Sequence, residues 1–379
     1  MHKLKIGFVF DDSLDKPDGV QQYVLILGRW LSEQGHDVHY LVGETKRTDI
    51  ANLHSLSRNI RVKFNQNRMA IPLPARLKPI RDVLRREDFD ILHIQVPYSP
   101  ALGARIIKAA GPRTAIIGTF HIAPHSKLVS LGNRALGVWV RSTLKRFDMM
   151  LATSEPARIF AQETFDIDST VVGLPLKLDA FYGAKPRVPY TGIRNVVFLG
   201  RLVERKGCQY LLQAVEYAVT HTMWPENVHV IICGGGPLEG QLKEYVRRHR
   251  LQDLVTFTGY ISEEDKPGYL AAADVVVYPS TGGESFGIVL LEAMAASRGV
   301  VLAGNNPGYA SVMRDRPESL FDPTNTPALA EKIVNALTET ASRIHARQWQ
   351  RKYVRGFDVS VIGRRTVAIY SQALHMRGE

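Results

Sequence analysis

The feature that most restricts the fold of this chain is an alternation of short apolar runs with helical stretches, which occurs twice along the sequence. In the first half, residues 5–10 and 36–43 are apolar runs typical of buried parallel strands, and residues 21–35 between them are typical of a helix. Parallel strands need a crossover of about a dozen residues, usually a helix, so this order predicts a parallel sheet covered by helices. The other strands expected in this half are residues 90–96, 114–120 and 149–154.

The same alternation restarts after a Pro- and Gly-rich stretch at residues 173–192, and we interpret the part near residues 175–192 as a hinge. A strand is expected at residues 195–201 and a helix at residues 207–219. The later strands are expected at residues 228–236, 255–260, 273–280 and 299–304. The sequence therefore predicts the α/β class, with two Rossmann-like, doubly wound parallel-sheet domains.

A length of 379 residues agrees with two or three domains. We expect the first domain to cover residues 1–177 and the second to cover residues 178–359. A further helix at about residues 360–379 is expected to pack back on the first domain.

The chain is basic, since 48 Lys and Arg residues stand against 37 Asp and Glu residues, a formal net charge of +11. Such a chain is attracted to nucleic acid, anionic membranes or phosphorylated small molecules. A nucleic-acid partner is not expected, because the sequence lacks aromatic residues clustered among cations. Two cysteines, Cys208 and Cys233, are too few for a disulfide framework or a cysteine zinc site. We find no signal peptide and no apolar run of ~18 residues, so a cytoplasmic protein is expected.

Ligands of open α/β sheets bind beyond the carboxyl ends of the strands, and several loops there carry suitable residues. Gly19 precedes a helix, where a phosphate or sugar oxygen could approach the backbone closely, although a plain turn would also use glycine. Arg201 ends a strand, and Arg205 and Lys206 precede the next helix. Cations at one strand end are suited to binding a diphosphate.

The segment 278–295 (YPSTGGESFGIVLLEAMA) carries the most information about chemistry. Glu284 lies in a glycine-rich loop, where its carboxylate can face a bound sugar. Glu292 lies in the helix that follows and can face hydroxyl groups nearer a nucleotide, such as those of a ribose. The N–H groups of Ser285, Phe286 and Gly287 lie at the start of this helix and are suited to holding phosphate.

Two other patterns do not predict sites of their usual kind. Residues 234–240 (GGGPLEG) have the wrong glycine spacing for a dinucleotide fingerprint. The Asp-x-Asp triplets at residues 88–90 and 166–168 are expected to be surface carboxylates, because neither follows a strand. No metal site is predicted.

With these motifs the chain resembles the retaining glycosyltransferases of family 4, which have the GT-B fold, and among them the bacterial phosphatidylinositol mannosyltransferases. Glu284 and Glu292 match the family's E-x7-E motif, and Arg201 and Lys206 match its diphosphate clamp. Asp18-Gly19 matches the N-domain glycine loop, and His121 matches the N-domain histidine. The runs 282–296, 17–21 and 89–94 are similar to those of the mannosyltransferases.

The resemblance implies two domains facing across a cleft and assigns roles to individual residues. His121 and Glu284 would act on the transferred sugar, His121 by contact near the reacting carbon. The residues implied to bind the donor are Gly19, Arg201, Lys206, Glu284, Ser285, Phe286, Gly287, Ile288 and Glu292. The residues implied to bind the acceptor are Asp12, Gln21, Tyr98 and Lys127. Departures from the family pattern gather in the first domain, where Asp12 replaces a tyrosine and Tyr98 an asparagine.

The implied reaction is transfer of a hexose with retention, by a hexosyltransferase that needs no cofactor or metal. We expect mannose to move from GDP-mannose to a membrane lipid such as phosphatidylinositol. An alternative is a UDP-sugar-dependent transferase acting on diacylglycerol or another glycan acceptor. A sugar-nucleotide epimerase on the same fold is disfavoured by the two glutamates and the two cations. The sequence does not predict the oligomeric state.

Residues 73–88 predict a basic amphipathic helix. Leu77, Ile80 and Leu84 share one face, and the cations around it are Lys78, Arg81, Arg85 and Arg86. Such a helix can lie on an anionic lipid surface or pack on its own domain. The family resemblance favours the membrane, which would place the protein peripherally on the inner face of the plasma membrane.

Overall fold

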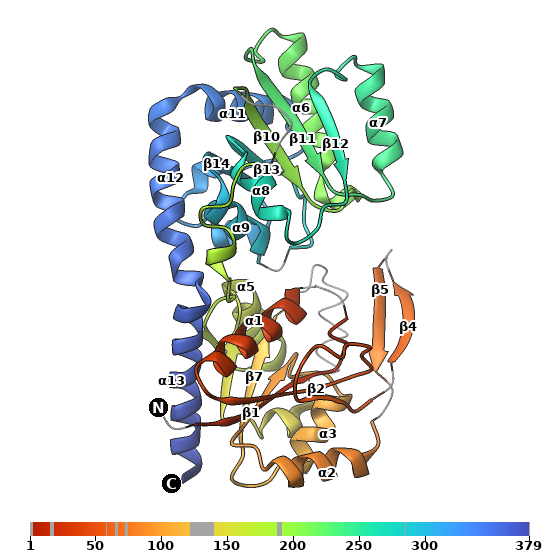
Figure 1. Cartoon of the computed structure of the whole chain (residues 1–379), viewed down its shortest axis with the longest axis vertical. Helices are drawn as coiled ribbons and strands as arrows, with labels where there is room; N and C mark the ends of the chain where they lie inside the picture. Colours follow the sequence, from red (N-terminus) through yellow and green to blue (C-terminus); the bar gives the residue numbers. More distant parts are fainter. Residues whose placement is uncertain are drawn as a thin grey trace. The chain divides into compact units, whose positions relative to one another are not determined.

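The computed structural model describes residues 3–15, 19–57, 75–121, 140–187, 192–284 and 286–378, together with the backbone of residues 59–64 and 67–72. The chain forms two units (Figure 1). One consists of Met1–Pro175 and Val359–Glu379, and the other of Leu176–Asp358. The expected limits of the second domain were residues 178 and 359.

The first unit is built on a parallel sheet with the strand order β3-β2-β1-β6-β7-β8-β9. The strands are β1 (Lys5–Phe10), β2 (Asp37–Val42), β3 (Leu53–Ser55), β6 (Ile91–Gln95), β7 (Ala115–Phe120), β8 (Met149–Ala152) and β9 (Thr170–Val171). An antiparallel hairpin of β4 (Asn59–Phe64) and β5 (Asn67–Pro72) stands apart from this sheet. The helices are α1 (Gly19–Glu33), α2 (Leu77–Glu87), α3 (Leu102–Ala109), α5 (Glu155–Phe165) and α13 (Val359–Gly378).

The second unit has a parallel sheet with the strand order β12-β11-β10-β13-β14-β15. Its strands are β10 (Arg194–Leu199), β11 (Val228–Cys233), β12 (Val255–Gly259), β13 (Val275–Tyr278), β14 (Val300–Gly304) and β15 (Leu320–Phe321). Its α-helices are α6 (Cys208–Thr220), α7 (Glu239–Arg248), α8 (Lys266–Ala271), α9 (Ile288–Ala296), α10 (Pro307–Val312), α11 (Thr326–Thr338) and α12 (Thr340–Val354). Short 3-10 turns include η2 (Glu204–Lys206) and η4 (Arg355–Phe357).

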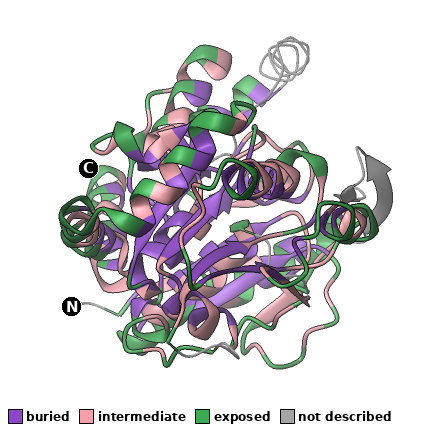
Figure 2. Ribbon diagram, turned by 90° about the horizontal axis from the view of Figure 1, so that it is seen from above, coloured by how far each residue is buried: buried purple, intermediate pink, exposed green. Residues whose placement is uncertain are grey.

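Both sheets are doubly wound, because the chain builds outward from the first strand in one direction and then in the other. The reversal lies between β1 and β6 in the first unit and between β10 and β13 in the second. Buried residues lie on the strands and on the inward sides of the helices (Figure 2). The predicted fold class of two Rossmann-like parallel-sheet domains is confirmed.

The C-terminal helix α13 belongs to the first unit, against α1 and β7 (Figure 1). A side chain at Gly363 of α13 would lie 2.3 Å from the Trp30 ring of α1, so the two helices approach closely there. The buried Tyr370 hydroxyl lies 2.7 Å from His93 Nδ1, and His93 Nε2 lies 2.6 Å from Thr119 Oγ1. Burial lowers the pKa of His93 to about 3, so the imidazole is neutral and joins α13 to β6 and β7 without a charge.

None of the helices in the described residues is both long and apolar enough to cross a bilayer.

Replacing Tyr370 with Phe should lower the free energy of unfolding of the first unit by about 1–3 kcal/mol, because a buried nitrogen of His93 loses its partner. The matched control is Tyr260→Phe, since the Tyr260 side chain is 80% exposed. Hydrogen exchange, which resolves the two units, should show faster exchange of α13 in Tyr370→Phe alone. Equal exchange in the two variants would contradict the anchoring role of this contact.

Candidate active site

The sheet topology places the predicted functional residues at two topological switch points. Ligands of doubly wound sheets bind beyond the carboxyl ends of the strands where the strand order reverses. In the second unit, Arg201 follows β10 and Glu284 follows β13, the two strands at the reversal. In the first unit, Asp12 follows β1 and Tyr98 follows β6.

The Glu284 carboxylate is the centre of a small ion cluster in the second unit. Its Oε1 lies 2.7 Å from Lys206 Nζ and 2.9 Å from Arg205 NH1, and it accepts a hydrogen bond from Ser280 Oγ at 3.0 Å. The Glu284 side chain is only 12% exposed. Sequence reasoning placed Lys206 near a diphosphate and Glu284 near a sugar, and it did not anticipate their direct contact. Arg201 is exposed.

The backbone of the Glu284 loop depends on two close approaches. Gly287, which precedes α9, has φ of 115°, and a side chain there would lie 2.7 Å from the Tyr309 ring. A side chain at Gly308 would lie 2.1 Å from the Glu284 carbonyl oxygen. The loop can therefore lie directly against the start of α10 only because both positions are glycine.

The remaining loop residues differ in what they offer a ligand. The Phe286 side chain is buried, with its ring centroid 5.7 Å from that of Phe357, so only its backbone is available. Ile288 is the first residue of α9. Ser285 lies outside the described residues.

Glu292 is buried in α9 with one carboxylate oxygen engaged and the other unpaired. Its Oε1 lies 3.0 Å from Lys266 Nζ, and Lys266 also lies 2.6 Å from Glu263 Oε2. Glu292 Oε2 has no hydrogen-bond partner among the described residues, although its side chain is only 6% exposed. A buried acceptor without a partner is unfavourable, so this oxygen is suited to accept from a ligand hydroxyl.

The charge states of this buried pair follow from opposing effects. Burial disfavours the charge on Lys266, but Glu292 and Glu263 outweigh burial and raise the pKa of Lys266. Burial raises the pKa of Glu292, and Lys266 offsets part of that increase. Sequence reasoning missed Lys266, and the only available signal was its place beyond the carboxyl end of β12.

In the first unit, His121 directly follows β7 and is buried beside the edge of Tyr23, with ring centroids 4.9 Å apart. His121 Nε2 donates to Gln95 Oε1 at 2.6 Å, which places the proton on Nε2 and leaves Nδ1 as an acceptor. Burial lowers the pKa of His121 to about 3, so the ring is neutral at physiological pH. A neutral imidazole with Nδ1 as an acceptor can accept a hydrogen bond from a ligand hydroxyl group.

The loop after β1 brings together two of the residues implied to bind the acceptor. Asp12 Oδ1 accepts from the Ser13 N–H at 2.7 Å, and the buried Gln21 donates from Nε2 to the Ser13 carbonyl oxygen at 3.2 Å. Gly19 begins α1, and a side chain there would meet no atom of the described residues within 4 Å. The described part of this unit therefore leaves room for a side chain at position 19.

Tyr98 has a clear packing role. Its ring joins an aromatic cluster, with centroids 5.7 Å from Phe120, 5.6 Å from Phe160 and 5.1 Å from Phe165. Burial raises the pKa of Tyr98 to about 12. The fourth residue implied to bind the acceptor, Lys127, lies outside the described residues.

Helix α2 exposes all four predicted membrane cations, Lys78, Arg81, Arg85 and Arg86. The membrane hypothesis would place the apolar face of this helix on lipid, but that face packs on the protein itself. Ile80 and Val83 are buried in the core of the first unit, and Leu84 packs against that core. Leu77 alone on this face is 43% exposed. The helix therefore packs on its own domain and offers charge, with little apolar surface, to a partner.

The two Asp-x-Asp triplets end helices. Asp88 and Asp166 are exposed C-cap residues of α2 and α5, with φ of 46° and 55°, and Asp90 accepts from the Lys5 N–H at 2.7 Å. The two cap positions and this hydrogen bond give a local structural role to three of the four aspartates in the triplets.

Comparison with known proteins gives matches over both units. The family described as Glycosyltransferase Family 4 matches residues 17–175, and the one described as Glycosyl transferases group 1 matches residues 193–339. The chain is 30% identical to a phosphatidyl-myo-inositol mannosyltransferase of Propionibacterium freudenreichii, over 98% of this chain and 95% of that protein. It is also 30% identical to a protein of that name from Mycobacterium tuberculosis, over 97% of this chain and 96% of the relative.

Solved structures share the fold at lower sequence identity. A glycosyltransferase from Rickettsia africae superposes with a TM-score of 0.73 at 19% identity, over 98% of this chain and 99% of that chain. HepE from Anabaena, solved in complex with UDP and glucose, gives a TM-score of 0.69 at 18% identity, over 97% of this chain and 100% of that chain. The chain therefore belongs to glycosyltransferase family 4, and it is a glycosyltransferase with the GT-B fold.

Proposed function

We propose that the protein transfers mannose from GDP-mannose to phosphatidylinositol at a membrane surface, with retention of the anomeric configuration. The relatives named phosphatidyl-myo-inositol mannosyltransferase support the sugar and the acceptor, because they match nearly the whole chain. The observation that carries the proposal of a nucleotide-sugar site is the buried Oε2 of Glu292, which has no partner in the described part of the chain and lies in the helix after β13, at the switch point of the second unit.

In this proposal the second unit binds the donor. Glu292 accepts from the ribose hydroxyls, while Lys266 holds its other oxygen. Arg201 and Lys206 neutralise the diphosphate as it leaves, and Arg205 adds a third cation to this loop. Fixed cations and the N–H groups that precede α9 stabilise developing negative charge without rearranging, which lowers the barrier. We expect no metal ion to be required.

Glu284 would orient the hexose. Among the described residues, its contacts to Lys206, Arg205 and Ser280 all involve Oε1, so Oε2 can accept from a sugar hydroxyl. The same cations that bind the diphosphate thus fix the carboxylate that binds the sugar. Phosphate and hexose would be positioned by one set of charges.

His121 would contact the transferred sugar from the first unit through Nδ1. In the proposed step, the acceptor hydroxyl attacks the anomeric carbon on the face from which GDP departs. The bond from the anomeric carbon to the acceptor oxygen forms as the bond to the phosphate oxygen breaks, and a phosphate oxygen takes the hydroxyl proton. Burial lowers the pKa of His121 to about 3, which makes the ring a poor base, so in this proposal it orients the sugar while the phosphate oxygen takes the proton.

The acceptor lipid requires the enzyme to reach a membrane, which we propose is the inner face of the plasma membrane. The exposed cations of α2 are suited to an anionic surface, where each contributes about 1 kcal/mol. Because the apolar face of α2 packs on its own unit, this attachment would be electrostatic and sensitive to salt.

The donor is tested by thermal unfolding with GDP-mannose or UDP-glucose. GDP-mannose at 100 times its dissociation constant should stabilise the protein by about 2.7 kcal/mol, whereas UDP-glucose should not. Incubation with GDP-mannose and phosphatidylinositol vesicles should then yield a mannosylated lipid by mass spectrometry. Stabilisation by UDP-glucose alone would contradict GDP-mannose as the donor. It would favour the alternative, a UDP-sugar transferase that acts on diacylglycerol or another glycan acceptor.

Replacing Glu284 with Gln should reduce turnover by about 100- to 1,000-fold, because the carboxylate that orients the sugar loses its charge and its ion pairs. Glu244→Gln is the matched control, since Glu244 pairs with Arg247 on the exposed surface of α7. Steady-state transfer rates and melting temperatures separate catalysis from folding. Near-normal turnover in Glu284→Gln would remove this residue from the mechanism.

Replacing Arg81, Arg85 and Arg86 with Gln should weaken binding to anionic vesicles by about 100-fold, from about 1 kcal/mol per cation. The control is the triple replacement of Arg247, Arg248 and Arg250, which removes the same charge from an exposed site of the second unit. Vesicle sedimentation measures both. If the two triple variants bind equally, α2 is not the membrane contact.

A further inference from the structure

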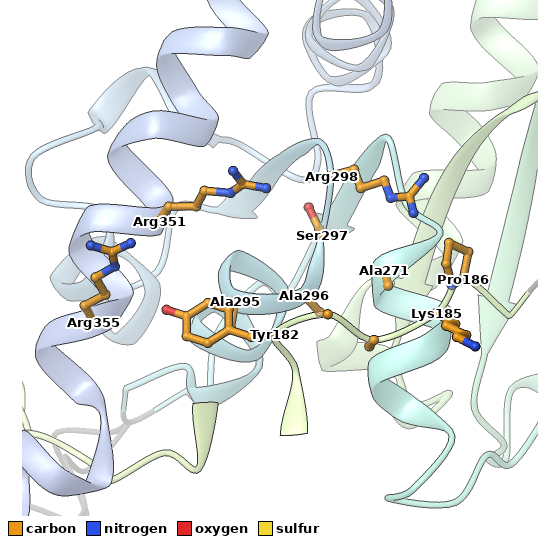
Figure 3. Close-up of a pocket in the computed structure, with 12 residues that line it drawn as sticks. Tyr182, Lys185, Pro186, Ala271, Ala295, Ala296, Ser297, Arg298, Arg351 and Arg355 are labelled. Atoms are coloured by element: carbon orange, nitrogen blue, oxygen red, sulfur yellow. The ribbon is translucent and has the colours of Figure 1, made fainter. Parts of the chain in front are cut away.

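The second unit has a pocket at the opposite end of α9 from the Glu284 loop. Its volume is about 450 Å³, and it is formed by residues 182–186, the C-terminal ends of α8 and α9, and the end of α12 (Figure 3). Helix α9 has nine residues, so its two ends are about 13 Å apart. The pocket is therefore distinct from the site that holds Glu284.

The pocket is lined by four cationic side chains, Lys185, Arg298, Arg351 and Arg355. In Figure 3, Arg351 and Arg355 extend from the end of α12, and Arg298 extends from the segment after α9. No Asp or Glu lies among the described residues that line it. All four cations are exposed, and no ion pair joins any of them to a carboxylate in the described part of the chain.

The pKa of a neighbouring arginine, Arg347, reflects the repulsion among the cations in this region. Burial and the nearby Arg351, Arg343 and Arg298 lower the pKa of Arg347, and Asp274 opposes them only in part. Arg347 Nε is buried and has no partner among the described residues. Bringing cations together without counter-charges is unfavourable in the free protein, and a bound anion would relieve the repulsion.

The partial charges at helix ends explain only part of the clustering of the four cations. The C-terminal ends of α8 and α9 carry partial negative charge, which attracts cations. Each end is equivalent to about half an elementary charge, and this falls well short of four full positive charges. The Tyr182 hydroxyl adds a donor to the lining. The charge, the donors and the volume thus fit a ligand of several negative charges.

We propose that this pocket binds an anion carrying two or more phosphate groups, at a site separate from the donor site. Guanidinium groups match phosphate oxygens in geometry and charge, and a pocket of this volume accommodates a phosphorylated small molecule. The ligand is either a soluble phosphorylated compound or the headgroup of a phosphorylated lipid. The proposal does not depend on the identity of the donor or the acceptor.

The position of the pocket in the chain gives the site a structural consequence. Residues 182–186 follow the segment where the chain enters the second unit, and Arg351 and Arg355 precede the segment where it leaves. These entry and exit segments already pair, because the Leu176 N–H donates to the Phe357 carbonyl oxygen at 2.8 Å. An anion held by both segments would fasten them together and stabilise this unit.

The test is calorimetric titration of the full chain with inorganic tripolyphosphate, using three double variants that each remove two positive charges. R351Q/R355Q alters the pocket, R201Q/K206Q alters the proposed donor site, and R364Q/R365Q is an exposed control on α13. Tripolyphosphate can also occupy the proposed diphosphate site at Arg201 and Lys206. Besides any binding there, we expect a binding event that R351Q/R355Q weakens at least about tenfold, as the loss of two charge-assisted contacts requires. This event should survive in R201Q/K206Q and stay within about twofold in R364Q/R365Q.

Two results would overturn the proposal: unchanged binding in R351Q/R355Q, or equal weakening in R364Q/R365Q, which would show an effect of net charge alone. If R351Q/R355Q does not fold, K185Q/R298Q tests the opposite side of the pocket. Vesicles containing a phosphatidylinositol bisphosphate, compared with phosphatidylserine vesicles of equal charge, separate the two sources. A preference for the bisphosphate that R351Q/R355Q abolishes indicates a lipid headgroup, and tripolyphosphate binding without that preference indicates a soluble anion.

Discussion

Every strand of the two main sheets runs in the same direction as its neighbours, and the rest of the structure depends on this parallel arrangement. Parallel strands end at one edge of a sheet, so the loops that follow them meet there. In the second unit this brings the turn after β10, with Arg205 and Lys206, against the loop after β13, with Glu284. Residues almost 80 positions apart in the sequence thus share one ion cluster.

The second constraint is that α9 is buried almost all round. Its residues Leu290 to Ala295 are buried, including Glu292. A carboxylate in such a helix needs a counter-charge, which Lys266 supplies from α8, and this fixes the orientation of the carboxylate before any ligand arrives. Burial of the Glu292–Lys266 ion pair is unfavourable, but it holds Glu292 Oε2 in a fixed position as a hydrogen-bond acceptor.

The sequence predicted the strands well, because buried parallel strands are continuous apolar runs. The strand predicted at residues 5–10 is β1, and that at residues 114–120 is β7 to within one residue. It missed the β4–β5 hairpin at residues 59–72, whose strands mix polar and apolar residues and lie outside the main sheet. Glycine and glutamate spacing located the Glu284 loop, and Arg205 was noted beside Lys206 as a cation at a strand end. That Arg205 and Ser280 contact Glu284, and that Lys266 pairs with Glu292, could not be predicted from spacing, since contacts between distant loops follow from sheet order. For helix α2 the sequence predicted the element but not its surroundings, because an amphipathic pattern does not tell whether the apolar face contacts lipid or the core of its own domain.

The place of α13 affects how the protein is made. The first unit needs Tyr370 beside His93 and Gly363 beside Trp30, yet α13 is synthesised after the whole second unit. During translation, residues 1–175 emerge before the second unit and remain without this helix while the whole second unit is being made. The second unit can fold as soon as its own contiguous segment, Leu176–Asp358, has emerged. The first unit is therefore completed only after the second unit has been synthesised, and the surfaces of α1 and β7 that α13 contacts stay exposed to solvent or chaperones until then.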